Sequence, residues 1–389
     1  MNILFDLIST QPKQNMRFHG GGEFTKKIFI ELTKDRKNNN IFGLYDKNRF
    51  FDESLYQYAK INGIDLIGVS NLNEINNILK IKKIDRIFVG MPEKIYEEIN
   101  YDNIDLIYCL HDTRRVGMRY QKFLWHYEKN YIRKIGARYL WPIFNYIRKK
   151  KTNKYRNNVM QLLKKANTII TVSNYSKYAI MQHCFKLNIE KKIKVCYSPE
   201  KIVRENTSNN YNKLEINNPY FLLISCNRYE KNSYLAVAAF DELFTNYEKI
   251  KNMRVVCCGN LPKSIKKKIK NENNFVFLDY VDSEQLESLY KNSFAFVYPT
   301  LYEGFGYPPL EAMKYGTPVI CSAITSVPEV CGDAGIYFNP YSKEELINAI
   351  LYSLNNDLTI YREKSLVRYK IMRKRQAESL KRIVAIILR

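Results

Sequence analysis

Short apolar runs rich in Ile and Val alternate with longer helix-like stretches throughout the first half of the chain. A strand that is buried on both faces of a parallel sheet gives such a continuous apolar run, and the helix that follows it covers the sheet. The pattern therefore predicts successive β-α-β units. The expected strands are residues 2–8, 41–45, 65–69, 85–89, 105–110, 168–172 and 194–196.

The same pattern starts again after a polar, Asn-rich stretch at residues 201–218, which is typical of a linker between domains. The sequence therefore predicts two Rossmann-like α/β domains, 1–205 and 215–368, and a final basic helix from about residue 360. No Gly-x-Gly-x-x-Gly follows an expected strand, which disfavours a dehydrogenase. The strands expected in the second domain are residues 220–226, 254–258, 275–278, 294–299, 318–322 and 335–338.

Length and composition agree with two folded domains. The chain has 389 residues, of which 46% are apolar, so each domain can bury a core. No apolar stretch approaches the ~20 residues that span a membrane, and the first residues, which carry an acid within an apolar run, are expected to form a strand rather than a signal peptide. The eight scattered cysteines lack zinc-site spacing, so we expect buried, reduced thiols in a cytoplasmic protein.

The net charge of +23 is concentrated in part of the chain. Residues 131–165 contain eleven Lys or Arg and no Asp or Glu, and both tryptophans, Trp125 and Trp141, lie in or beside this stretch. Apolar residues recur there at helical spacing. We expect residues 125–165 to form a surface for the anionic inner face of a membrane, and a basic face that only aids solubility explains the composition equally well.

The segment 303–311, which reads Glu-Gly-Phe-Gly-Tyr-Pro-Pro-Leu-Glu, is the most informative motif. It follows the apolar run 294–299, and its two prolines suit the first turn of a helix, where a missing N–H does no harm. The pattern predicts a strand, a loop and a helix, with Glu303 on the loop and Glu311 in the first helical turn. Seven residues separate the two carboxylates.

This strand-to-helix corner has the properties of a nucleotide-sugar site. Ligands of open α/β sheets bind where strands end and helices begin, and a helix N-terminus favours phosphate. Gly304 and Gly306 allow the backbone to approach a ligand closely. The flanking carboxylates can accept hydrogen bonds from sugar hydroxyls. Taken alone, Glu311 would more often only stabilise the helix dipole, and Glu303 would more often be a solvated acid on a loop. The inference therefore depends on the whole motif.

The motif resembles the signature of family 4 glycosyltransferases, which are retaining enzymes of the GT-B fold that transfer a sugar from a nucleotide-sugar donor. The similarity continues through residues 311–320, 326–330 and 332–340. The resemblance implies two Rossmann-like domains facing a central cleft, with a last helix, 369–389, packed back on the first domain. It implies that Glu303 is catalytic and that the donor is bound by Gly304, Phe305, Gly306 and Glu311.

A second part of the implied site follows the first strand of the second domain. Arg228 and Lys231 lie on this loop and match the basic pair that binds the donor diphosphate in the family. The loop is shorter than is common in the family and has Cys226 in place of a glycine, so the register of Arg228 is less secure than that of Lys231.

The resemblance also assigns residues of the first domain. The glycine triplet 20–22 follows the first strand and precedes a helix expected to begin near Glu23, and the family implies that Gly21 and Gly22 approach the donor. His111 and Asp112 follow another strand. His111 is implied to be catalytic, as a contact of the transferred sugar, and Asp112 to lie on the acceptor side.

The expected function is the retaining transfer of a hexose from a nucleoside-diphosphate sugar, of the GDP-mannose or UDP-hexose type, to a glycan or lipid-linked glycan in cell-surface polysaccharide or lipopolysaccharide synthesis. No Asp-x-Asp motif stands in a suitable place, so no metal is expected, and no cofactor is needed because the nucleotide sugar is a substrate. We expect no nucleic-acid partner. The alternatives are a basic nucleic-acid- or membrane-binding protein without transferase activity, an epimerase or phosphorylase of the same fold, and a non-catalytic partner subunit.

Overall fold

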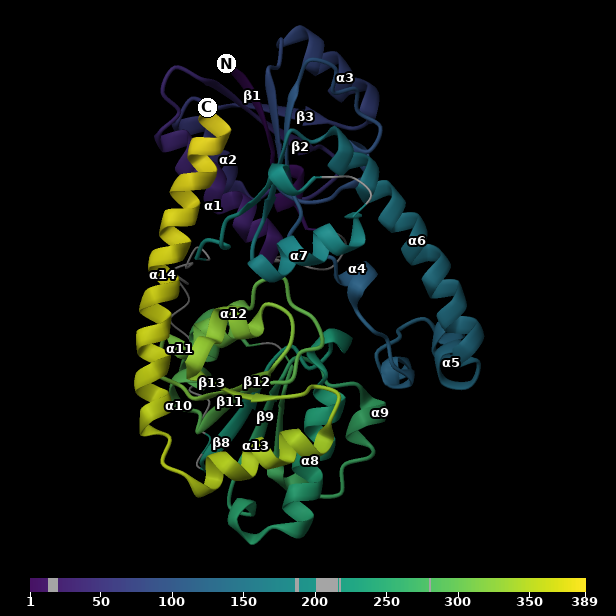
Figure 1. Cartoon of the computed structure of the whole chain (residues 1–389), viewed down its shortest axis with the longest axis vertical. Coiled ribbons are helices and arrows are strands. Elements are labelled where there is room, and N and C mark those ends of the chain that lie inside the picture. Colours follow the sequence, from purple (N-terminus) through teal and green to yellow (C-terminus); the bar gives the residue numbers. More distant parts are fainter. Residues whose placement is uncertain (13–19, 186–188, 201–215, 217, 280) are drawn as a thin grey trace. The chain divides into compact units, whose positions relative to one another are not determined.

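The computed structural model describes residues 1–12, 20–185, 189–200, 216, 218–279 and 281–389. Its contacts divide the chain into two compact units. The first unit contains Met1–Gly117, Thr152–Val203 and Arg373–Arg389, and the second contains Met118–Lys151 and Arg204–Met372. Each unit is built around one parallel sheet (Figure 1).

The first unit has a seven-stranded sheet with the order β3-β2-β1-β4-β5-β6-β7. Every pair in it is parallel. Aromatic packing fills the core below the central strands, where the rings of Phe5 and Phe88 stack with centroids 4.7 Å apart. The strands are β1 (Asn2–Asp6), β2 (Asn40–Asp46), β3 (Asp65–Val69), β4 (Arg86–Val89), β5 (Asp105–Cys109), β6 (Thr168–Thr171) and β7 (Ile193–Val195).

The second unit has a six-stranded sheet with the order β10-β9-β8-β11-β12-β13, again with all pairs parallel. The strands β8, β11 and β12 are buried at every position, as expected for strands covered by helices on both faces. The strands are β8 (Tyr220–Leu223), β9 (Arg254–Cys258), β10 (Phe275–Leu278), β11 (Ala295–Tyr298), β12 (Val319–Ser322) and β13 (Gly335–Phe338).

The predicted α/β fold class is confirmed, since every predicted strand is present with ends that differ by at most a few residues. Most of the predicted linker, 201–218, lies outside the described residues.

The helices are α1 (Gly20–Lys34), α2 (Glu53–Ile61), α3 (Leu72–Ile81), α4 (Arg114–Gly117), α5 (Tyr131–Tyr139), α6 (Trp141–Lys165), α7 (Asn174–His183), α8 (Ser233–Asn246), α9 (Lys263–Lys266), α10 (Ser283–Asn292), α11 (Tyr307–Met313), α12 (Val327–Cys331), α13 (Lys343–Asn355) and α14 (Thr359–Leu388).

The end of α14 packs on the first unit, as the family resemblance implied. The guanidinium of Arg86 donates to the carbonyl of Ile387 at 2.7 Å, and the amide of Gln376 donates to the carbonyl of Ser198 at 2.6 Å. The hydroxyl of Ser379 also accepts a hydrogen bond from the backbone N–H of Tyr197. Residues 373–389 are therefore tied to the first sheet by polar contacts as well as by buried apolar side chains.

The two units differ from the predicted division in one place. The prediction assigned residues 1–205 to the first domain, whereas residues 118–151 cluster with the second unit. Contacts made by aromatic side chains cause this, because the rings of Phe123 and Tyr234 stack at 4.9 Å and Tyr127 hydrogen-bonds to Ser233 at 2.8 Å. A local sequence pattern gives no sign of contacts between segments about a hundred residues apart.

All eight cysteines are buried and none forms a disulfide, as expected. Burial raises the pKa of several of these thiols, for example that of Cys196 to about 11. The thiols with a raised pKa are neutral, and all eight cysteines serve as buried core residues. No helix within the described ranges is long and apolar enough to cross a membrane.

Candidate functional site

Two loops meet where the strand order of the second sheet reverses, between β8 and β11. Connections from neighbouring strands leave in opposite directions at such a point, which opens a crevice beyond the carboxyl ends of the strands. The chain after β8 forms a short 3₁₀ helix, Tyr229–Lys231, and the chain after β11 leads to Glu303. Strand order therefore brings Lys231 and Glu303 to the same corner of the sheet.

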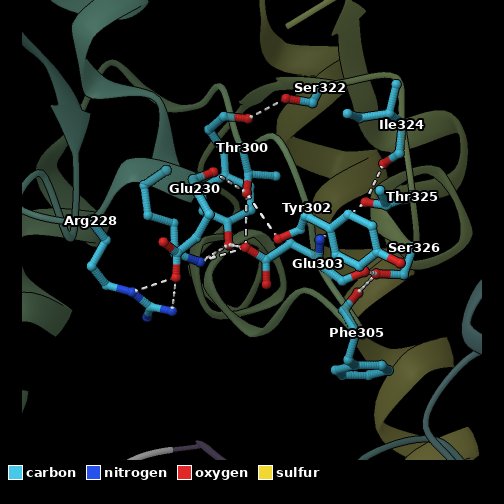
Figure 2. A network of polar contacts seen from close by, with 12 residues as sticks. Arg228, Glu230, Thr300, Tyr302, Glu303, Phe305, Ser322, Ile324, Thr325 and Ser326 are labelled. Carbon is cyan, nitrogen blue, oxygen red and sulfur yellow. Dashed lines mark hydrogen bonds and ion pairs between the residues drawn. The ribbon is translucent and has the colours of Figure 1, made fainter. Parts of the chain in front are cut away.

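Glu303 lies at the centre of a polar network (Figure 2). One carboxylate oxygen, Oε1, accepts hydrogen bonds from Lys231 Nζ at 2.5 Å, from the Tyr298 hydroxyl at 2.6 Å and from the Thr300 hydroxyl at 2.9 Å. Lys231 Nζ also donates to the Tyr298 oxygen at 2.7 Å. Among the residues that the structure describes, none donates to the second oxygen, Oε2. That oxygen can accept from a ligand.

The ion pair is nearly buried, with side-chain exposures of 6% for Lys231 and 15% for Glu303. Burial by itself would raise the pKa of Glu303, but the charge and hydrogen bond of Lys231 outweigh it and hold that pKa below its usual value. Burial lowers the pKa of Lys231, and Glu303 opposes this shift. Glu303 is therefore an ionised carboxylate that accepts only, in a place where a ligand would be largely shielded from water.

Backbone contacts fix the loop that carries Glu303. The hydroxyl of Ser326 donates to the carbonyls of Glu303 at 3.1 Å and of Phe305 at 2.7 Å. The Glu303 N–H donates to the Thr325 hydroxyl at 3.3 Å. Gly306 precedes α11 with φ = 114°, a conformation that favours glycine. The loop is thus held at both ends, which orients the carboxylate before any ligand binds.

The predicted helix after the loop is present as α11, with both prolines in its first turn. Glu311 lies in this helix but beyond its first turn, where it was expected, because the helix begins at Tyr307. Its Oε2 accepts a hydrogen bond of 3.3 Å from the hydroxyl of the buried Tyr290. Arg228 lies on the β8 loop and forms an ion pair with Glu230. The Glu230 carbonyl in turn accepts from the Leu301 N–H at 2.7 Å, which joins the two loops.

The first unit has a comparable corner, where its strand order reverses between β1 and β4. Gly21 lies within the first turn of α1, because the helix begins at Gly20, so the expected start near Glu23 is wrong by one turn. A Cβ at Gly21 would lie 2.1 Å from the sulfur of Met91, so a larger residue here would have to displace the flexible end of the Met91 side chain. Gly22, the next residue, is buried.

His111 and Asp112 follow β5, beside this corner. The Nε2 atom of His111 lies 2.9 Å from the carbonyl oxygen of Gly90, and the ring packs edge-on against Phe24 at 4.4 Å. The Asp112 carboxylate accepts from the N–H of Arg114 at 2.9 Å, a local turn contact. The first corner thus brings His111 and the β4 loop together, while Asp112 is bound within its own loop.

Three residues of these corners were not singled out from the sequence. Tyr298 and Thr300 are direct partners of Glu303, and the only signal for them is a polar end to an apolar strand. Asp6 at the end of β1 is buried and accepts hydrogen bonds from Ser9, Tyr96 and the Gly90 N–H. Burial raises its pKa to about 6. In the sequence, Asp6 was noticeable only as an acidic residue within the first apolar run.

The described parts of the chain contain no group of three or more His, Cys, Asp or Glu side chains that could hold a metal ion. Within the second unit, the network joins Lys231, Glu303, Tyr298 and Thr300, with Arg228 and Glu311 on the loop and helix next to it. The arrangement offers one fixed cation, Lys231, a more exposed cation, Arg228, and oriented carboxylates next to a loop that contains two glycines. It is suited to an anionic ligand that also carries hydroxyl groups.

Comparison with known proteins finds similarity to glycosyltransferases. Residues 206–372 match the family model of the glycosyl transferases group 1, a stretch that contains the whole network around Glu303. O-antigen chain mannosyltransferase B of Escherichia coli is 51% identical over 81 residues, which are 21% of this chain and 21% of that protein. O-antigen chain mannosyltransferase RfbU of Salmonella typhimurium is 32% identical over 134 residues, 31% of this chain and 38% of that protein.

These matches span only about a fifth to two fifths of the length of the curated relatives. The fold likeness covers the whole chain. A crystal structure of Anabaena Alr3699/HepE in complex with UDP and glucose aligns with a TM-score of 0.66 and 16% identity, over 99% of this chain and 98% of that one. The fold is therefore that of the GT-B glycosyltransferases, with two Rossmann-like domains.

Proposed function

We propose that the chain is a retaining glycosyltransferase that moves a hexose from a nucleoside-diphosphate sugar to a hydroxyl group of a glycan acceptor. The observation that carries the proposal is the Lys231–Glu303 pair, which lies where the strand order of the second sheet reverses. This pair falls within the stretch that matches the group 1 glycosyl transferases. Because of this match, the alternative of a nucleic-acid-binding protein without transferase activity is less well supported.

Lys231 is assigned to the donor diphosphate. Its ammonium group has three N–H donors, and Tyr298 and Glu303 accept two of them in the structure. The third is left for a phosphate oxygen, so the lysine can bind phosphate without giving up its contact with Glu303. Arg228 adds a second cation on the same loop, with an exposed side chain that can turn to the ligand. Together they would stabilise the charge of the departing diphosphate.

The two glutamates are assigned to sugar hydroxyls. Glu303 has one oxygen occupied by three donors, and its Oε2 would accept from a hydroxyl of the transferred sugar and orient the ring. Glu311 would bind the ribose diol, and Gly304, Phe305 and Gly306 would allow the backbone to approach the donor. For the first unit, the roles that the family resemblance implies for Gly21, Gly22, His111 and Asp112 remain predictions.

In the proposed reaction, the bond between the anomeric carbon and the diphosphate oxygen breaks, and the acceptor oxygen forms a new bond to that carbon on the same face. The acceptor proton passes to the departing phosphate, so no carboxylate base is required. Positive charge grows on the sugar ring while negative charge grows on the phosphate. The proposal assigns neutralisation of the phosphate to Lys231 and Arg228 and needs neither a metal ion nor a cofactor.

The proposed donor is GDP-mannose or a UDP-hexose, and the proposed acceptor is a glycan or lipid-linked glycan of cell-surface polysaccharide synthesis, at the inner face of the membrane. The two relatives named above are O-antigen chain mannosyltransferases, which supports a mannose donor and a lipopolysaccharide acceptor. The aligned crystal structure contains UDP and glucose, which supports a uridine nucleotide.

The test is thermal stabilisation of the protein by a panel of nucleoside diphosphates and their sugars. One base is expected to raise the melting temperature by several degrees, and Lys231→Ala should abolish the shift. Lys251→Ala is the matched control, because Lys251 also pairs with a glutamate but is half exposed at the surface. Stabilisation by nucleic acid but by no nucleotide would contradict the proposal.

A further inference from the structure

A helical hairpin of the second unit exposes an unusual set of apolar side chains. The hairpin comprises α5 and the first part of α6, residues 131–151, and follows the η3 turn Lys122–His126. Within seventeen consecutive residues, eight large apolar side chains are between 39% and 79% exposed. They are Tyr131, Ile132, Ile135, Tyr139, Leu140, Ile143, Tyr146 and Ile147. No other stretch of comparable length within the described ranges exposes as many.

These side chains recur at helical spacing. Ile132, Ile135 and Tyr139 lie on one stripe of α5, and Ile143 and Ile147 lie on one stripe of α6. The two helices pack closely, since a Cβ at Gly136 would lie 3.3 Å from the ring of Phe144. A hydrated face would not retain so much apolar surface, so the hairpin has the character of an interface.

The charge of the hairpin indicates what covers it. Residues 129–151 contain eight basic side chains and no acidic one, and one of the eight, Arg148, pairs with Glu128 just before this stretch. A second copy of this surface would be repelled, because the same cations would face one another. Apolar side chains bordered by lysine and arginine match the interfacial region of an anionic bilayer. There, apolar burial and electrostatic attraction both contribute to the free energy of binding. The basic residues are Lys129, Arg133, Lys134, Arg138, Arg148, Lys149, Lys150 and Lys151.

We propose that the α5–α6 hairpin is a docking surface for an anionic lipid bilayer, and that the exposed isoleucines and tyrosines enter the headgroup region while the basic residues bind lipid phosphates. The bilayer contact is interfacial, since no helix within the described residues is able to span a membrane. The proposal concerns the surface only and holds whether or not the transferase assignment is correct.

The tryptophans have a different role from the one expected from the sequence. The guanidinium of Arg138 lies 4.6 Å from the centre of the Trp125 ring, and Lys268 Nζ lies 5.7 Å from it. Trp141 stacks on Phe144 at 6.0 Å. Trp125 thus joins α5 to the body of the second unit, and Trp141 supports the hairpin from within. The tyrosines, rather than the tryptophans, are the exposed aromatic residues of the docking surface.

Binding to lipid vesicles tests the proposal with the full chain. The protein is expected to sediment with vesicles that contain phosphatidylglycerol and to remain in solution with pure phosphatidylcholine. The triple variant Ile132→Ser, Ile143→Ser, Ile147→Ser should bind at least tenfold more weakly. The control Ile61→Ser, Ile81→Ser removes two isoleucines that are also strongly exposed, 82% and 77%, but lie in the first unit. The control should bind like the wild type.

A charge series tests the electrostatic part. Lys149→Gln with Lys150→Gln should weaken binding to anionic vesicles, and added salt should weaken the wild type in the same way. The charge-matched control is Lys60→Gln with Lys80→Gln, two exposed lysines of the first unit. Because both tryptophans lie in or beside the hairpin, a change in intrinsic fluorescence on vesicle binding gives an independent readout.

Three outcomes would overturn the proposal. The first is equal binding to neutral and anionic vesicles, or binding to neither. The second is loss of binding in the control variants to the same degree as in the hairpin variants. The third is a lipid-free oligomer that the isoleucine variant dissociates, which would identify the surface as a contact between copies of the chain. Nucleotide-induced stabilisation should persist in every hairpin variant. A failure of the lipid-docking proposal can therefore be distinguished from a failure of the transferase assignment.

Discussion

Lys231 Nζ lies 2.5 Å from Glu303 Oε1, although 72 positions separate the two residues in the sequence. The cation and the carboxylate come from the loops after β8 and β11, which are neighbours in the sheet. Each charge compensates the other in a nearly buried place. The proposed phosphate-binding residue and the proposed sugar-binding residue therefore compensate each other's charge, and removing either charge should lower the stability of the folded protein.

The first prediction concerns the stability of this pair. Lys231→Met or Glu303→Gln alone should lower the free energy of unfolding by about 3–5 kcal/mol, because the remaining partner is left buried without compensation. The double variant should cost less than the sum, with a coupling of about 1–3 kcal/mol in urea denaturation. The half-exposed pair Lys343–Glu242 is the control, with an expected coupling below about 1 kcal/mol. Additive effects at Lys231 and Glu303 would contradict the interdependence.

The second prediction separates catalysis from nucleotide binding. Glu303→Gln keeps the shape of the side chain but removes the negative charge, so it should lower kcat by about 10²-fold or more while nucleoside-diphosphate stabilisation is retained. The measurement is nucleotide release from the donor sugar, together with the thermal shift. Glu287→Gln, at a half-exposed carboxylate paired with Lys314, should leave both unchanged. An unaltered kcat in Glu303→Gln would remove this residue from the proposed mechanism.

The third prediction concerns the support of Lys231 by the segment 118–151. The Tyr127 oxygen bonds to the Ser233 hydroxyl at 2.8 Å and accepts from the Tyr234 N–H at 3.0 Å, two and three positions after Lys231. Tyr127→Phe removes the acceptor of the Tyr234 N–H and one partner of the Ser233 hydroxyl, which still donates to the Cys226 carbonyl. The expected cost is about 1–3 kcal/mol, and nucleotide binding should weaken several-fold.

The matched control for this change is Tyr131→Phe, which removes a hydroxyl from a tyrosine that is 76% exposed. It should alter neither stability nor the thermal shift with nucleotide. If Tyr127→Phe lowers stability but leaves nucleotide affinity unchanged, the segment does not position Lys231. Isothermal titration with the stabilising nucleotide distinguishes the two results.

The fourth prediction is a pH dependence centred on His126. Burial, with the nearby cations Lys268, Lys134 and Arg138, lowers the pKa of this histidine to about 4. Its Nε2 faces Lys268 Nζ at 3.5 Å and its Nδ1 lies 2.8 Å from the Ser264 hydroxyl, so the ring is neutral and accepts from the lysine.

The unfolded chain takes up this proton near pH 6.5 and the folded protein only near pH 4, so the unfolded state binds more protons between these values. Stability should therefore fall as the pH drops through this window, by up to about 3 kcal/mol from His126 alone. Urea denaturation of wild type and His126→Gln between pH 4 and 7 measures the difference. Parallel curves for the two proteins would contradict the prediction.

Local patterns in the sequence predicted most of the elements. Buried parallel strands appear as short apolar runs, so all predicted strands, from 2–8 to 335–338, are present. The two prolines predicted the start of α11 correctly. The start of α1 was misplaced because a glycine triplet is more typical of a turn than of a helix, whereas here all three glycines lie in the first turn of α1.

The sequence by itself therefore determined the two α/β units, the strand–loop–helix motif around Glu303 and the residue types of the candidate site, because periodicity and turn residues act over a few positions. Only the tertiary structure decided that Lys231 pairs with Glu303, that Tyr298 and Thr300 complete the network, and that residues 118–151 join the second unit. These contacts depend on strand order and on packing between distant segments, which no local pattern encodes.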